Sequence, residues 1–352
     1  MGTIRFLLAL AVVFSHSYGY LLVGGRLAVQ MFYIISGYLI SYILIEAKTY
    51  SSIKKFYFNR ILRLFPAYYF ISFLTFILFA YLSLDSDVPF FDTFDKINIF
   101  GKIYLIFSNF FIVGQDLAFF MGIKDGGIQF LSDYTDSEII IYQGHISGVS
   151  WTLSLEIMFY FIAPFILKNK KIIVYILVSS ILLRALLIFD GIGMTGGFNY
   201  RFFPLELGLF LLGALSHQII KPFLKSYLSN GFDIISNYVT YFIITYIIFF
   251  SFIPGIVINT LLMIALLIIN LPLIFNFQNN HKWDAWIGKF SYPVYICHFM
   301  ILVAAQEFFP EQNQSWLTFI LFATLLLAFI TEYLINKPIE KIRNRNRNRN
   351  IT

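Results

Sequence analysis

The sequence predicts an all-α protein, a polytopic membrane helix bundle with about ten transmembrane helices. Of its 352 residues, 59% are hydrophobic and only 12% are charged, whereas soluble domains carry about 25% charged residues. The apolar residues fall into runs near the ~20 residues that a helix needs to cross a bilayer. Phe and Tyr are abundant, at 43 and 23 residues, which is typical of lipid-facing helices and interfacial belts.

The expected spans follow from these apolar runs, at about 4–20, 27–46, 61–82, 150–167, 172–190, 202–220, 236–253, 256–275, 291–308 and 315–335. Within the first run, Arg5 followed by the apolar stretch Phe6–Phe14 resembles a signal peptide. No small-residue cleavage site comes after it, so we expect a retained helix. Segment 101–114 is too short to cross, and we expect it to be interfacial or re-entrant.

The positions of Lys and Arg predict the orientation. With both termini in the cytoplasm, every short inner loop is basic, as the positive-inside rule requires. A crossing at 101–114 would instead place Lys168, Lys170 and Lys171 outside. The net charge of +6 is therefore assigned to cytoplasmic loops, and nucleic acid is not an expected partner. We expect a multi-pass protein of the plasma (inner) membrane.

The expected domain organisation is simple. A transmembrane domain covers 1–340 and includes one long outer segment, 83–148, which either caps a site or is a solvated loop. A basic cytoplasmic tail follows at 341–352, where alternating Arg and Asn favour contact with anionic lipid. Cys297 is the only cysteine, so an intrachain disulfide is excluded.

Ionisable residues inside spans are costly and often functional. His16 lies eleven residues after Arg5, so both share one helix face, ~16 Å apart along the axis. One interpretation is a cation at the inner mouth with a proton-transfer group deeper on the same path. The alternative is a snorkelling Arg and a His that hydrogen-bonds to another helix.

Arg60 and Arg63 are neighbours on one helix face. Two guanidinium groups there would bind a phosphate or pyrophosphate. The alternative is ordinary positive flanking charge.

Three further ionisable residues are candidates. Glu156 lies ~9 Å inside the fourth span, near the expected depth of His16, where it would orient the imidazole or pin two helices together. Glu206 has a comparable depth, with its pairing to Arg201 open. His298, near Pro293, is a helix–helix hydrogen-bonding residue or a chemical group.

At this point the motifs resemble the membrane acyltransferase 3 family, which includes bacterial O-acyltransferases of surface polysaccharides. The resemblance runs from about residue 3 to 340. It rests on six motifs in order: Arg5-x10-His16, Phe32-Tyr-Ile-Ile-Ser-Gly-Tyr-Leu-Ile40, Arg60-x-x-Arg63, Trp151-Thr-Leu-Ser-Leu-Glu156, Ser291-Tyr-Pro-Val-Tyr-Ile-Cys-His298 and Lys337-Pro338. Two positions depart from the family, since Gln30 and Asn336 stand where many members carry an acid.

The resemblance implies an integral membrane enzyme that takes an acyl group, typically acetyl, from acyl-CoA. It places the histidine at His16 and the CoA-binding arginines at Arg5, Arg60 and Arg63, with no bound cofactor and no metal. The expected acceptor is a sugar hydroxyl of a cell-surface glycan, free or polyprenyl-linked. Catalysis is assigned to His16, supported by Glu156. Substrate-contact or structural roles are open for Trp151, Ser154, Glu206, Tyr292 and His298.

The alternative function is a proton-coupled membrane transporter or exporter, in which buried His and Glu relay protons. The sequence contains no convincing inverted repeat of broken spans, which such transporters often have. The identity of the acceptor sugar and the oligomeric state do not follow from the sequence.

Overall fold

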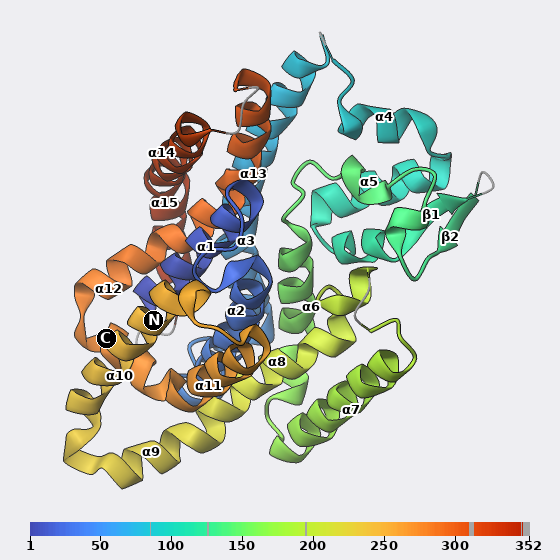
Figure 1. Ribbon diagram of the computed structural model, residues 1–352. Coiled ribbons are helices and arrows are strands. Elements are labelled where there is room, and N and C mark those ends of the chain that lie inside the picture. The colour runs from blue at the N-terminus through green and yellow to red at the C-terminus, as the bar shows by residue number, and fades with distance from the viewer. Residues whose placement is uncertain (85, 125–126, 194–195, 310–312, 346, 348–352) are drawn as a thin grey trace. The chain divides into compact units, whose positions relative to one another are not determined.

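The computed structural model describes residues 1–347 except 85, 125–126, 194–195, 310–312 and 346. It is built almost entirely of helices (Figure 1), which confirms the predicted all-α membrane bundle. Within the described part of the chain, eight helices are long and apolar enough to cross a membrane. Three apolar helices are shorter: Gly2–Ser17 and Trp151–Ile166 at two of the expected spans, and Ile99–Phe111 at the expected short segment.

The helices form two compact units, each described by itself. The first comprises residues 1–67, 163–173 and 209–352. Its helices are α1 (Gly2–Ser17), α2 (Gly24–Ser41), α9 (Lys221–Leu228), α10 (Phe232–Phe249), α11 (Ile256–Asn280), α12 (Lys282–Ile287), α13 (Ser291–Phe308), α14 (Gln314–Thr331) and α15 (Lys337–Arg345). Of the expected tail 341–352, positions 346 and 348–352 lie outside the described residues.

The second unit comprises residues 68–162 and 174–208. It holds α4 (Pro89–Lys96), α5 (Ile99–Phe111) and a two-stranded antiparallel sheet of β1 (Met121–Lys124) and β2 (Gly127–Phe130), paired from Met121↔Phe130 to Lys124↔Gly127. Four helices continue from one unit into the other: α3 (Ile53–Leu82), α6 (Trp151–Ile166), α7 (Lys170–Phe189) and α8 (Phe203–Leu215).

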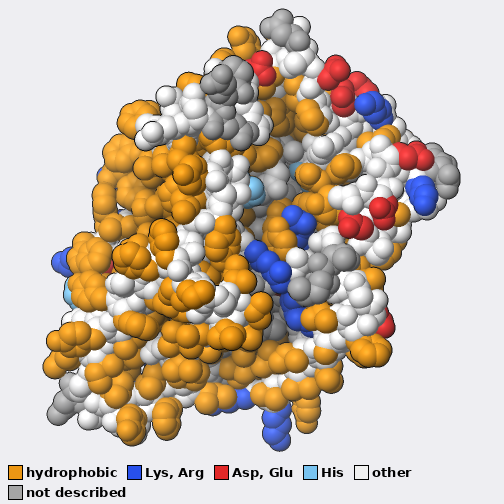
Figure 2. Space-filling view, viewed as in Figure 1, with side chains coloured by type: hydrophobic (Ala, Val, Ile, Leu, Met, Phe, Trp, Pro, Cys, Tyr) orange, Lys and Arg blue, Asp and Glu red, His pale blue; other side chains and the backbone are white. Residues whose placement is uncertain are grey.

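Much of the surface is apolar, as expected for a protein that is embedded in lipid. Figure 2 shows hydrophobic side chains over much of the visible face, while the acidic side chains gather mainly over α4, β1 and β2. Exposed apolar residues such as Phe189, Phe252 and Ile258 would be unfavourable in water over so large an area. The acidic part belongs to segment 83–148, which the sequence predicts to lie outside the bilayer.

Helix α1 is the centre of the first unit. It packs against α2, α12 and α13, and Ile4, Leu8 and Val12 on it are buried. Its first amides, which lack partners within the helix, are capped by the carboxylate of Asp284 in α12. Asp284 accepts from the Gly2 N–H at 2.7 Å and from both the N–H and the hydroxyl of Thr3, at 2.8 and 2.7 Å. The cap fixes the start of α1 on α12.

A second fixed contact joins α2 to the part of α8 that lies in the first unit. A Cβ on Gly37 would stand 1.8 Å from the carbonyl oxygen of Phe210, and one on Gly213 would stand 1.9 Å from that of Ile34. Only glycine permits this approach, because any side chain would collide with backbone. The sequence pair Ser36-Gly37 therefore marks a helix-packing site.

At the C-terminal ends of α2 and α8, two π-helical turns bring polar groups together. The turns are η1 (Tyr42–Glu46), which continues α2, and η6 (Ser216–Ile220), which continues α8. His217 lies between the Ser41 hydroxyl, 3.0 Å from its Nδ1, and the Glu46 carboxylate, 2.8 Å from its Nε2. Lys221 pairs with the same carboxylate at 2.6 Å. The polar groups at the ends of these two helices thus satisfy one another.

Replacement of Gly37 by Ala tests the close helix contact. The added methyl must push the α8 backbone away, and we expect a loss of about 1–3 kcal/mol in stability, the usual cost of overpacking. The measurement is the apparent melting temperature of the detergent-solubilised protein. Gly231→Ala is the matched control, since a Cβ there lies 3.5 Å from Ile235, an ordinary contact. Equal melting of both variants and the wild type would contradict a tight contact.

Candidate active site

A cavity of about 590 Å³ with a strongly basic wall opens within the first unit. We call it the basic pocket. Among the residues that the structure describes, seven Lys or Arg side chains and two carboxylates line it, together with smaller polar and apolar residues. The charged members are Arg5, Arg63, Lys289, Lys337, Lys341, Arg343, Arg347, Glu332 and Glu340. Such an excess of positive charge suits a ligand that carries several phosphate groups.

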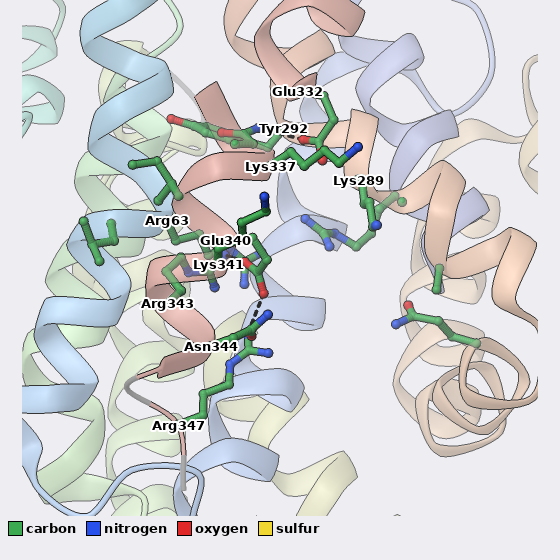
Figure 3. Close-up of a pocket in the computed structure, with 17 residues that line it drawn as sticks. Arg63, Lys289, Tyr292, Glu332, Lys337, Glu340, Lys341, Arg343, Asn344 and Arg347 are labelled. Carbon is green, nitrogen blue, oxygen red and sulfur yellow. Dashed lines mark hydrogen bonds and ion pairs between the residues drawn. The ribbon is translucent and has the colours of Figure 1, made fainter. Parts of the chain in front are cut away.

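Several helices supply these charges. Arg5 comes from α1, Arg63 from α3 and Lys289 from the short turn between α12 and α13. The remaining cations lie on α15 or just after it, and Figure 3 shows this helix with its side chains around the pocket. Glu340 forms ion pairs with Arg343 and, at 3.1 Å, with Arg347. These pairs hold the two guanidinium groups beside the pocket.

Tyr292 also lines the basic pocket, and Figure 3 shows it beside Glu332 and Lys337. Its hydroxyl donates to the carbonyl oxygen of Leu64 at 2.7 Å. That bond joins the start of α13 to α3, one residue after Arg63. Tyr292 therefore has a structural contact at the wall of the site.

The structure separates the two arginines of the Arg60-x-x-Arg63 motif. Arg63 lines the pocket, whereas Arg60 is 3% exposed and absent from the lining. The Arg60 Nη2 donates to the Tyr50 hydroxyl at 3.1 Å and to the Asn59 side-chain oxygen at 3.2 Å. Three residues turn a helix by about 300°, which leaves the two side chains ~60° apart. That offset is enough for one to enter the pocket while the other packs inside.

His16 lies near the other end of α1 from Arg5. Its Nδ1 is 3.1 Å from the Nε2 of His298 on α13, and the two rings are inclined by only 17°. His298 is 1% exposed, whereas His16 is an exposed residue. The Nδ1 of His298 is 2.7 Å from the carbonyl oxygen of Tyr295. The first unit thus contains a hydrogen-bonded histidine pair with one accessible member.

Glu156 belongs to the second unit, on α6. It is half-buried and accepts a hydrogen bond from the hydroxyl of Tyr160, one turn further along the same helix. Four residues separate the two side chains, the spacing at which helical neighbours meet. This contact orients the Glu156 carboxylate within its own helix.

Ser154, also on α6, anchors the segment that the sequence places outside. Its hydroxyl donates to Asp116 at 2.6 Å and accepts from the Gly114 N–H at 2.9 Å. Asp116 is 2% exposed, and burial raises its pKa from 3.8 to about 6. Ser154 has a structural role in this network.

Trp151, at the start of α6, belongs to an aromatic cluster around Arg201. The guanidinium carbon of Arg201 lies 4.2 Å from the Phe119 ring centroid, 4.6 Å from that of Tyr200 and 5.2 Å from that of Trp151. Cation–π contacts of this kind contribute more when the charge is shielded from water. The cluster ties the start of α6 to Phe119 of segment 83–148.

Glu206 is fully buried and pairs with Arg184 of α7 at 2.6 Å. Sequence spacing does not decide whether Glu206 pairs with Arg201. Arg184 is visible in the sequence as a charge within the fifth expected span, but its partner lies 22 positions away on another helix. The pair compensates two charges that would each be costly alone.

Sequence reasoning misses most of the pocket wall. It treats Lys289, Lys337, Lys341, Arg343 and Arg347 as inner-loop or tail charges and assigns none of them to a site. A signal exists in the density of basic residues after α14, but no spacing rule indicates which helix they face. Among the described residues, no group of three or more His, Cys, Asp or Glu is placed to hold a metal ion.

Comparison with protein families decides the assignment. The family described as an acyltransferase domain (Acyl_transf_3) matches residues 2–333. The chain belongs to this family. The resemblance predicted from the sequence is confirmed over nearly the whole chain, and the protein is a membrane acyltransferase.

Two further comparisons add little. The chain is 26% identical over 205 residues to an uncharacterized protein of Aquifex aeolicus (strain VF5), a match that covers 55% of this chain and 88% of that relative. No solved structure matches the chain. The pocket cations on α15 and after it lie beyond the residues that the family matches.

Asp116→Asn provides a test of the buried network. The folded pKa of Asp116 lies above its ordinary value, so ionisation destabilises the fold, and this cost grows as pH rises from about 4 to about 6. The amide keeps an acceptor for Ser154 without charge. We expect the substitution to raise stability by up to about 3 kcal/mol above pH 6 and to change little at pH 4. The measurement is the apparent melting temperature against pH, and equal effects at pH 4 and pH 8 would contradict the prediction.

Proposed function

We propose that the protein is an integral membrane O-acyltransferase that takes an acyl group, chiefly acetyl, from acyl-CoA on the cytoplasmic side. It transfers the group to a sugar hydroxyl of a cell-surface or lipid-linked glycan. The observation that carries this proposal is the placement of Arg5 and His16 on one helix. Arg5 lines the basic pocket, and the exposed ring of His16 lies further along α1.

The donor assignment rests on charge and length. The 3′-phosphate and pyrophosphate of CoA carry several negative charges, and the described residues that line the pocket include seven cations against two carboxylates. Arg63 provides a planar fork for one phosphate. The helical rise puts His16 ~16 Å beyond Arg5 along the axis, a separation that the extended pantetheine arm suits. The phosphates would remain in the pocket while the thioester reaches His16.

Sidedness rests on the positive-inside rule. The pocket cations include loop and terminal residues that the rule assigns to the cytoplasm, where acyl-CoA is made. The acceptor then approaches from the opposite end of α1. A glycan, free or carried on a polyprenyl lipid, supplies a hydroxyl there.

The reaction that these groups support is a direct acyl transfer. His16 takes the proton of the acceptor hydroxyl as its oxygen attacks the thioester carbonyl carbon. A new C–O bond forms and the C–S bond breaks. The CoA thiolate leaves and takes the proton back from His16, so the ring ends neutral. An acyl group carried briefly on His16 would use the same nitrogen lone pair.

Glu156 and Arg60 remain part of the proposal in different ways. Glu156 stays a candidate catalytic residue, and Glu156→Gln, which keeps its acceptor oxygen toward Tyr160, tests whether its charge contributes to the rate.

Arg60 is proposed to support the pocket by packing beside Tyr50 and Asn59. Arg60 substitutions should therefore lower stability more than acyl-CoA affinity.

His16→Ala tests the proposed role of His16 as the general base. We expect transfer to fall about 10²–10⁴-fold, the usual contribution of a positioned acid–base group. The measurement is label from radioactive acetyl-CoA recovered in the glycan fraction of membranes that contain the full chain. Mass spectrometry of surface glycan should show the matching loss of acetyl mass. Full transfer by the variant would reject the role of His16, and wild-type membranes that never label glycan would favour a transporter.

Arg63→Gln tests the donor pocket. Loss of one charged phosphate contact costs about 1.5–3 kcal/mol, so we expect the KM for acetyl-CoA to rise about 10- to 150-fold with a smaller change in maximal rate. Arg345→Gln is the control, because Arg345 is an exposed cation on α15 that does not line the pocket. An equal KM in both variants would show that the basic pocket does not bind the acyl-CoA donor.

A further inference from the structure

Three observations converge on His298. It is buried at 1% exposure, it contacts the one residue proposed as base, and its second nitrogen has a partner with a single possible role. That partner is the carbonyl oxygen of Tyr295, which can only accept. The Nδ1 of His298 therefore carries a proton and donates it to Tyr295 over 2.7 Å.

This assignment fixes the rest of the chain of hydrogen bonds. Only one proton fits between the His16 Nδ1 and the His298 Nε2, which lie 3.1 Å apart. If His298 held it, that ring would be a cation buried within an apolar bundle, which is costly. With the proton on His16 Nδ1, both rings are neutral. The lone pair of His16 then lies on Nε2, across the ring from His298.

We infer that His298 is a positioning residue that fixes the tautomer and orientation of His16. The inference rests on the proposed function, since it specifies which atom of His16 reacts. The acceptor hydroxyl gives its proton to His16 Nε2, its oxygen bonds to the acyl carbon, and the departing thiolate recovers the same proton. During the step His16 is an imidazolium whose Nδ1–H donates to a neutral acceptor, a charge-assisted bond stronger than the resting one.

The surroundings of the pair support a fixed geometry. The Tyr295 ring lies 5.9 Å from the His298 ring and 6.2 Å from that of Phe32 on α2. Cys297, the residue before His298, points to Thr331 of α14 with its sulfur 3.6 Å from the hydroxyl. Among the described residues, the titratable side chains in contact with His298 are those of His16 and Tyr295. Among the described residues, the hydrogen-bond partners of His298 are His16 and the Tyr295 carbonyl, and neither is a carboxylate.

Two substitutions separate the inference from general damage. His298→Phe fills the space without an acceptor. His298→Gln places an amide N–H toward Tyr295 and an amide oxygen toward His16 Nδ1, so it keeps the acceptor and cannot ionise. Cys297→Ser is the matched control, because it changes the neighbouring residue on the face toward α14 and keeps a partner for Thr331. Melting temperatures of the full-length variants monitor folding.

The assay follows acetyl transfer from radioactive acetyl-CoA to the glycan fraction of membranes, at saturating donor and over a range of pH. We expect His298→Phe to lower the maximal rate about 100-fold with the KM for acetyl-CoA within about twofold of the wild type. The acidic limb of its pH–rate profile should move to lower pH by about one unit, because the His16 imidazolium loses a hydrogen-bond acceptor. His298→Gln should keep at least about a tenth of the rate and leave the acid limb in place.

Other results would overturn the inference. They are an unchanged rate in His298→Phe, a rate loss without movement of the acid limb, or a His298→Gln variant as slow as His298→Phe. The proposed function is tested separately by His16→Ala. If that variant is inactive while His298→Phe is normal, the acyltransferase mechanism stands and only the role of His298 is lost.

Discussion

The first unit depends on the way α1 is held at both ends. Asp284 caps its first amides, and His298 bonds to His16 in its last turn. Between these points one face of the helix, with Ile4, Leu8 and Val12, is buried against its neighbours. A helix fixed in this way acts as a rigid spacer, since its rise per residue is constant. The distance from the basic pocket to His16 is therefore set by the backbone.

The polar groups inside the helices divide into two kinds. Glu206 with Arg184, and His217 with Glu46, satisfy each other within the protein and hold helices together. Glu206 is fully buried, and loss of Arg184 would leave its charge unpaired at a cost of about 3–5 kcal/mol. The contacts within the two pairs explain these residues without a chemical role. His16 differs because it is an exposed residue while the residue that orients it is buried. Accessibility combined with a buried, fully satisfied orienting group is what a reactive side chain requires.

Hydropathy predicts the class of fold because the cost of exposed backbone in lipid leaves helices as nearly the only solution. Sequence spacing also predicts that Arg5 and His16 share a helix face, since turn counting is reliable within one element. Sequence spacing does not predict contacts between different helices. His16 and His298 are 282 positions apart, and no local spacing indicates such a pair. The division of Arg60 from Arg63, and the contribution of α15 to the pocket, likewise depend on how whole helices pack.

The choice of a histidine to orient His16 has a physical basis in this setting. In soluble hydrolases a buried carboxylate orients the catalytic imidazole, and its charge is balanced by nearby donors. Inside an apolar bundle a lone carboxylate at position 298 would require desolvation of a full charge in the resting enzyme. A neutral imidazole offers one acceptor nitrogen and anchors its other nitrogen on the Tyr295 carbonyl within its own helix. It thereby fixes the tautomer of His16 at lower cost, and the pair carries charge only while the transferred proton is on His16.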